Sequence, residues 1–112
     1  MWDILIHILV VTTRLKPEHR DAWIDRMTRH IQTCRANEPD CLQLDLVQSN
    51  DDPDHVFLYE VYESKESFDA HWDSSYQKQL MVDVQGWAVE PPEIILCTNV
   101  YPVDSEMKSW AS

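Results

Sequence analysis

The sequence predicts an α+β domain in which helices cover one face of an antiparallel sheet. Three observations support this prediction: strands with alternating apolar residues, helices with apolar stripes, and a strand–turn–strand unit in mid-chain. The predicted order is β-α-β-β-α-α-β, the split βαβ arrangement with its second helix broken in two. The 112 residues fit a single domain over 1–112, with a core at about 6–101 and a C-terminal tail at 102–112.

The middle of the chain shows the strand pattern most clearly. A strand is predicted at Cys41–Gln48, where leucines at alternate positions share one face, and another at His55–Glu63. The segment Ser49–Asp54 between them is rich in Asp, Asn and Pro, which favour tight turns. These three segments predict a pair of antiparallel strands.

Two further strands and a long helix flank this pair. The first strand is expected at about Ile6–Leu15, which is rich in β-branched residues, and the last from Glu93 to about Tyr101. A helix is expected to start at Pro17, where a missing N–H costs nothing, and to end near Arg35 or Ala36. Its apolar stripe is predicted to comprise Trp23, Met27, Ile31 and Cys34.

The second helix is expected in two pieces. Ser64 is a good N-cap for a short helix that runs to about Trp72. A break at residues 73–75 opens a third helix, whose apolar stripe runs from Tyr76 to Trp87, and Pro91 and Pro92 stop it. The sheet is therefore expected to carry three helices on one face.

The composition excludes several functional classes. The net charge of −11, from 20 acidic and 9 basic residues, argues against binding of nucleic acid and of anionic membranes. No signal peptide is recognised, because Asp3 stands where a positive segment is needed. The expected location is the cytoplasm. Only one glycine, Gly86, is present, so long flexible linkers are not expected.

Metal and disulfide chemistry is not expected either. Three cysteines without C-x-x-C spacing indicate neither a disulfide framework nor a zinc site. His7, His30 and His55 show no ligand-like pairing, and His19 is expected to be exposed to solvent. No metal, flavin or haem is therefore predicted.

The face of the sheet away from the helices is expected to be apolar. Val11, Phe57, Tyr59 and Val61 are predicted to lie on it. An uncovered apolar face of this kind favours burial against a second copy, so a homodimer joined through the open faces is expected.

Alternation in the third strand predicts which side chains face the helices. If Leu58 does so, then Glu60 and Tyr62 do as well. A carboxylate on that face costs free energy unless it is paired, so Glu60 is predicted to have a partner or a function. Burial would suit it to acid–base work; the alternative is a hydrogen-bonded structural anchor.

Several other residues are candidates for a pocket between sheet and helices. His71 shares a helix face with Phe68 and is a candidate base, or else a partly exposed helix histidine. Hydroxyl groups that could orient a substrate belong to Thr13, Tyr62 and Tyr76. Trp72 and Trp87 are candidate pocket walls, although tryptophans at such positions more often belong to the core.

Three motifs make the chain resemble the antibiotic biosynthesis monooxygenase superfamily. They are the Glu-Pro-x-Cys-Leu turn at 38–42, the Leu-Tyr-Glu-Val-Tyr-Glu-Ser strand at 58–64 and Phe-Asp-Ala-His at 68–71. The resemblance covers roughly residues 8–101. It implies a ferredoxin-like fold, assembled as a dimeric α+β barrel, with a buried pocket between the sheet and the helices.

The chain departs from two branches of that superfamily. At the positions that match the haem-degrading branch it has Thr13, Tyr62 and Met81, so haem degradation is not expected. The resemblance is to the quinol monooxygenase-like and autoinducer isomerase-like branch, and the latter shares the Tyr-Glu-x-Tyr strand at 59–62. Many of these members carry a second histidine where this chain has Tyr76. The resemblance therefore does not carry over a two-histidine mechanism.

The expected function is a cofactor-independent monooxygenase acting on a small phenolic or quinol-like substrate. In this hypothesis His71 is the base, Glu60 supports it, and Tyr62, Tyr76 and Thr13 orient the substrate. One alternative is an isomerase of a small carbonyl compound, which needs the same acid–base groups without oxygen. Another is a non-catalytic small-molecule-binding or stress-response protein.

Overall fold

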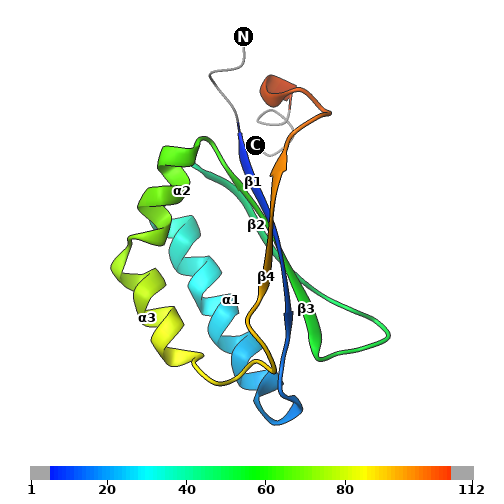
Figure 1. Cartoon of the computed structure of the whole chain (residues 1–112). Helices are drawn as coiled ribbons and strands as arrows, with labels where there is room; N and C mark the ends of the chain where they lie inside the picture. Colours follow the sequence, from blue (N-terminus) through cyan, green and yellow to red (C-terminus); the bar gives the residue numbers. More distant parts are fainter. Residues whose placement is uncertain (1–5, 107–112) are drawn as a thin grey trace.

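The computed structural model describes residues 6–106 and has the predicted α+β architecture (Figure 1). A 3₁₀ turn at Pro17–His19 precedes the first α-helix. The strands and α-helices follow in the order β1 (His7–Arg14), α1 (Arg20–Asn37), β2 (Cys41–Gln48), β3 (His55–Tyr62), α2 (Lys65–Trp72), α3 (Ser75–Asp83) and β4 (Glu93–Thr98).

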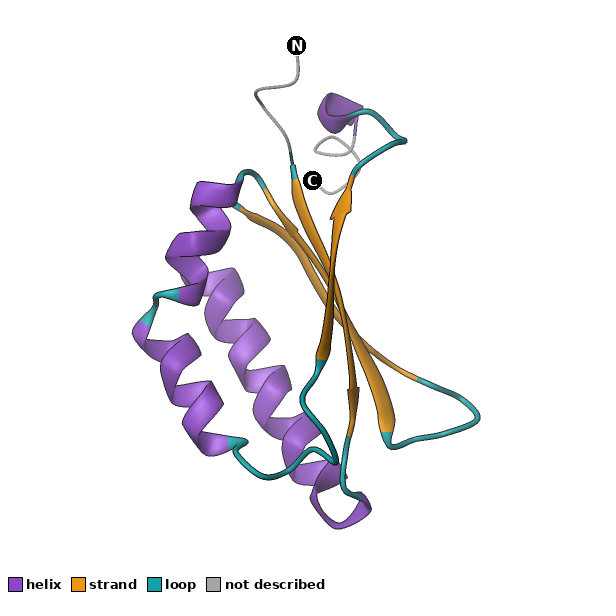
Figure 2. Ribbon diagram, viewed as in Figure 1, coloured by secondary structure: helices purple, strands orange, loops and turns teal. Residues whose placement is uncertain are grey.

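The four strands form an antiparallel sheet in the order β2-β3-β1-β4, and the three helices lie on one side of it (Figure 2). Directly paired residues share a face of the sheet. One row runs across all four strands through Leu44, Glu60, Leu9 and Leu96. Glu60 therefore stands in an otherwise apolar row that faces the helices.

The main core lies between this face and the helices. Its buried members are Leu9, Val11, Leu15, Trp23, Met27, Val56, Leu58, Tyr62 and Leu80. The buried stripe of α1 differs from the prediction in one member, because His30 is buried and Ile31 is only half-buried. An imidazole therefore stands in the apolar stripe of the longest helix.

The outer face of the sheet differs from the prediction at one position. Val11 faces the helices, because it lies two residues from Thr13 on the same strand. Val61 does lie on the outer side, but it is 1% exposed and packs with Ile6 and Ile8. Tyr59 is half-buried on that face.

Helix α3 ends earlier than the sequence suggested. The prediction extended its stripe to Trp87, but the helix ends at Asp83. Gly86 then adopts a φ of 82°, a conformation that turns the chain and that L side chains rarely adopt. Trp87 lies beyond this turn and packs against the core, and its backbone carbonyl accepts from Lys16.

Strand β4 is also shorter than predicted. It ends at Thr98, which pairs with His7, the first residue of β1. Beyond this point the Asn99 side chain bonds Pro102 and Asp104, which bends the chain away from the strand. The predicted C-terminal tail comprises residues 102–112, of which 107–112 lie outside the described residues.

The remaining helix boundaries agree closely with the predictions. Ser64 caps α2 by accepting a hydrogen bond from the Ser67 backbone N–H, and α1 ends one or two residues later than expected. Within residues 6–106, no helix is both long and apolar enough to cross a membrane.

Candidate functional site

A cavity of about 800 Å³ lies between the sheet and the helices. Most of its wall is apolar, and all four strands, the three helices and the loop after α3 contribute to it. Three of the predicted site residues, Thr13, Glu60 and His71, supply polar groups to this wall. The cavity is partly open to solvent, and a concave apolar space with a few polar groups is the usual form of a small-molecule site.

His71 is held in place by a carboxylate. Its Nδ1 lies 3.0 and 3.1 Å from the two carboxylate oxygens of Glu38, the residue that caps the C-terminus of α1. A carboxylate accepts hydrogen bonds, so Nδ1 is the donor in this contact, and in the neutral tautomer that donates through Nδ1 the lone pair is on Nε2. Within residues 6–106, Nε2 makes no hydrogen bond and is not fully enclosed, so it is the nitrogen available to a molecule in the cavity.

Glu60 has the kind of partner that the structural alternative predicts, because its Oε1 accepts a hydrogen bond of 2.7 Å from the Tyr62 hydroxyl. Within residues 6–106, no hydrogen bond joins Glu60 to His71, the residue that it was expected to support. Burial raises the pKa of the Glu60 carboxyl, although the bond from Tyr62 acts in the opposite direction. Burial also raises the pKa of Tyr62, so its phenol remains the donor.

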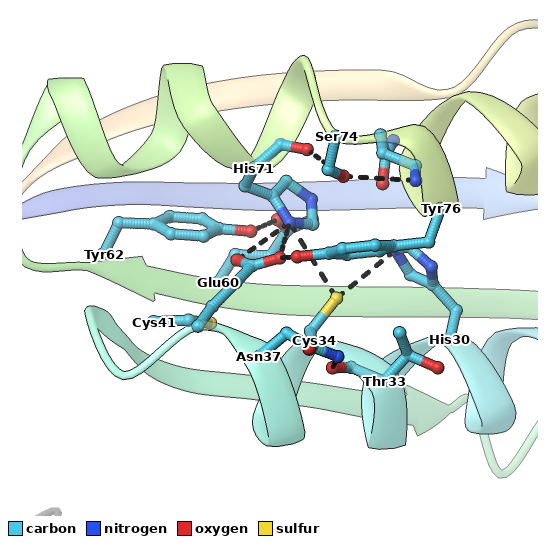
Figure 3. A network of polar contacts seen from close by, with 12 residues as sticks. His30, Thr33, Cys34, Asn37, Cys41, Glu60, Tyr62, His71, Ser74 and Tyr76 are labelled. Carbon is cyan, nitrogen blue, oxygen red and sulfur yellow. Dashed lines mark hydrogen bonds and ion pairs between the residues drawn. The ribbon is translucent and has the colours of Figure 1, made fainter.

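Glu38 links two of the predicted residues. Besides His71, it accepts a hydrogen bond from the Tyr76 hydroxyl, whose pKa is raised by burial and by that bond. Tyr76 therefore positions the carboxylate and is not part of the cavity wall. Figure 3 shows Tyr76 and His71 side by side above α1.

Two more residues of α1 complete this polar cluster (Figure 3). The Cys34 sulfur lies 3.5 Å from His30 Nε2 and 3.8 Å from His71 Nδ1. Burial lowers the pKa of His30 to about 4, so this ring is neutral near pH 7. Burial raises the pKa of the Cys34 thiol.

The other predicted residues are divided between the cavity and its surroundings. Thr13 is 7% exposed, and in the described part of the chain its hydroxyl has no hydrogen-bond partner and is not fully buried. Trp72 is 45% exposed, stacks on Phe68 and forms part of the cavity rim. Trp87 is not part of the cavity wall, because its ring stacks on His19 with ring centroids 5.6 Å apart. That contact leaves His19 half-buried, not exposed as predicted.

The sequence analysis missed Glu38, His30 and Cys34 as site residues. Their spacing of four residues places them on one face of α1 and its C-terminal cap, and that signal was available. The spacing within α1 does not predict where α2 packs. His71 reaches this face only because the fold places α2 beside the end of α1.

These features define a ferredoxin-like fold with a cavity between the sheet and the helices, and sequence comparison identifies the family. The model of the family described as antibiotic biosynthesis monooxygenase matches residues 6–82, more than half of the chain, and the chain belongs to this family. No curated protein matches the sequence significantly.

Solved structures agree with this assignment. The chain is 25% identical to a protein from Nitrosomonas europaea named "Putative antibiotic biosynthesis monooxygenase", with a TM-score of 0.80 over 91% of this chain and 97% of that one. A protein of the same name from Caulobacter crescentus has 21% identity and a TM-score of 0.83, covering 87% and 92%. A conserved protein from Methanosarcina mazei Go1 has 18% identity and a TM-score of 0.79, covering 87% and 95%. The last two likenesses show the fold alone.

Proposed function

We propose that this protein is a cofactor-independent monooxygenase that oxidises a small phenolic or quinol-like substrate in the cavity. The observation that carries the proposal is the histidine at the cavity wall. His71 has its Nδ1 occupied by Glu38 and its Nε2 free. A base oriented by a carboxylate is the arrangement needed to remove a proton from a bound hydroxyl group.

Membership of the antibiotic biosynthesis monooxygenase family supports the same reaction class. In the proposed reaction, His71 Nε2 takes the proton of a phenolic hydroxyl. The electron-rich anion then reduces O₂ itself. One oxygen atom enters the ring and the other leaves as water, so a quinol becomes a hydroxyquinone and no external reductant is consumed.

The protein contributes position and a dry environment to this reaction. Apolar walls such as Leu9, Leu58 and Leu80 exclude water and hold an aromatic ring. The free Thr13 hydroxyl can bond a substrate oxygen. Glu60, whose pKa is raised by burial, is suited to pass a proton to an oxygen that gains charge.

Oxygen uptake with a panel of quinols and phenols tests the proposal. The expected result is substrate-dependent uptake by chelator-treated protein, with one atom of ¹⁸O₂ found in the product. Conversion of a carbonyl compound without oxygen uptake would favour an isomerase instead. A change in tryptophan fluorescence on ligand binding, without turnover of any compound, would favour a binding protein.

We also propose that two copies associate through the outer face of the sheet. Apolar side chains on this face include Phe57, Tyr59 and Ile95, and Ile95 is 47% exposed. A stable interface there is expected to bury more than about 1,000 Å². Sedimentation at micromolar concentration is expected to give a dimer, and a monomer would contradict the proposal.

A further inference from the structure

Three buried side chains meet between α1 and α2, beside the cavity. His30, Cys34 and His71 are 3%, 0% and 4% exposed, and each brings a nitrogen or sulfur atom to within 4.8 Å of the others. We propose that these three residues bind a divalent transition metal ion, and that zinc is the ion this donor set fits best.

The distances suit a tetrahedral ion. Zinc bonds of about 2.3 Å to sulfur and about 2.0–2.1 Å to nitrogen place tetrahedral S and N ligands about 3.6 Å apart. The observed separations of the Cys34 sulfur from His30 Nε2 and His71 Nδ1 are 3.5 and 3.8 Å. Two of the three separations therefore lie near the value that an ion needs, and the two nitrogens lie within 4.8 Å of one another.

Helix geometry and charge support the same site. His30, Cys34 and Glu38 follow one another at intervals of four residues, so they lie on one face of α1 and its cap. The Glu38 carboxylate, already 3.0 Å from His71 Nδ1, can turn to become the fourth ligand. A thiolate and a carboxylate together neutralise a doubly charged ion, which removes most of the cost of burying it.

The surroundings of His30 provide an outer hydrogen-bond partner. Its Nδ1 and the Gln77 Oε1 are both buried, and among the described residues neither has a hydrogen-bond partner. The Gln77 amide lies close enough to raise the pKa of the imidazole, but the geometry falls short of a hydrogen bond. Metal-bound histidines usually donate their second N–H to such an oxygen, so a small rotation of either group would complete the site.

Hydrogen bonds from a thiol S–H and an imidazole N–H would also account for the short contacts. The two arrangements differ in one measurable respect, because only metal binding converts the sulfur to a bound thiolate. An ion on Nδ1 would also leave the proton of His71 on Nε2. Occupancy of this site and the proposed action of His71 as a base therefore exclude one another. The site itself does not depend on that proposed function.

The test is a titration of reduced, tag-free protein with Co²⁺, followed by competition with Zn²⁺. The expected result is a thiolate-to-cobalt charge-transfer band that saturates at one ion per chain and disappears when zinc displaces cobalt. Cys34→Ser is expected to abolish the band and to weaken zinc binding by about 100-fold or more. Gln77→Met is expected to weaken it by about 10-fold, the size of an outer-partner effect.

Cys41→Ser is the matched control, because Cys41 is a nearby free cysteine outside the three-residue cluster. It is expected to keep the band and the affinity. Circular dichroism checks that each variant is folded, and His30→Gln replaces Cys34→Ser if that variant does not fold. Absence of the band in the wild-type protein would overturn the proposal. Equal binding by wild type and Cys34→Ser, or loss of the band only in Cys41→Ser, would overturn it as well.

Discussion

The two faces of the sheet differ in the burial of polar and apolar groups. On the face that meets the helices, Glu60 is 8% exposed, yet it is hydrogen-bonded within the chain and borders a cavity. On the outer face, Tyr59 and Ile95 are apolar groups that the described chain leaves partly uncovered. The same two-residue alternation thus builds a candidate reaction site on one side and a candidate contact surface on the other.

The largest expected effect comes from the helix-facing side. His71→Ala is expected to lower kcat/KM for the proposed oxidation by about 10²–10⁴-fold, the usual size of an acid–base contribution. The fold should survive, as judged by circular dichroism. His55→Gln is the control, because His55 is not part of the cavity wall. Full activity of His71→Ala would remove the base from the proposed mechanism.

The outer face is expected to respond through assembly and not through chemistry. Tyr59→Glu would bury an unpaired charge between the two sheets of the proposed dimer, at a cost of about 2 kcal/mol or more. The dimer dissociation constant should therefore rise by at least about 30-fold in sedimentation experiments. Val82→Glu, on the exposed surface of α3, should leave the dimer dissociation constant unchanged. An unaltered dimer in Tyr59→Glu would place the contact surface elsewhere.

A third prediction concerns the buried carboxyl of Glu60 on the helix-facing side and its effect on stability at different pH values. Its raised pKa means that the folded chain binds the proton more tightly than the unfolded chain. Its stabilising contribution is therefore complete below the unfolded pKa and is lost as the pH rises through the folded value. Relative to wild type, Glu60→Gln should gain stability as the pH rises from 4 to 8, by about 1 kcal/mol, measured by urea unfolding.

Glu93 provides the control for that experiment, because it is an exposed carboxylate on the outer side of β4. Relative to wild type, Glu93→Gln should not gain stability as the pH rises from 4 to 8. If the difference in unfolding free energy between Glu60→Gln and wild type stays constant with pH, Glu60 is ionised to a similar extent in the folded and unfolded chains.

Neighbouring threonines on β1 give the smallest effect and the closest comparison. Thr13 borders the cavity, whereas Thr12 points outward and bonds His55. Thr13→Val should raise KM about three- to fivefold, the loss of one modest hydrogen bond. Thr12→Val should leave KM unchanged in steady-state kinetics. Equal effects of the two variants would mean that the Thr13 hydroxyl does not contact substrate.

Local patterns were sufficient for most of the fold. Alternation identified the face of Glu60. Ser64 was predicted as a helix cap, and in the structure its side chain accepts from the backbone N–H three residues later. The end of α3 was missed, because the apolar spacing of Val84 and Trp87 continues past the point where Gly86 turns the chain. A helical period in the sequence does not record where the backbone leaves the helix.

The candidate site was less predictable, for a different reason. Its central contact joins Glu38 and His71, which lie 33 positions apart in the sequence. Strand alternation and helix spacing describe one element at a time, so neither could choose between Glu38 and Glu60 as the partner of His71. That choice depends on how α2 lies over the end of α1.

The loop after α3 suggests how such a protein can change its substrate while keeping its reaction. Residues 84–86 and 88–92 border the cavity. The loop is fastened to the sheet where Ala88 bridges Leu15 and where the Val89 N–H bonds the Arg14 carbonyl. His71 and Glu38 lie on other elements. Mutations at exposed positions such as Val89 and Glu90 can therefore reshape the cavity during evolution or in a directed-evolution library, while the groups proposed for proton transfer stay in place.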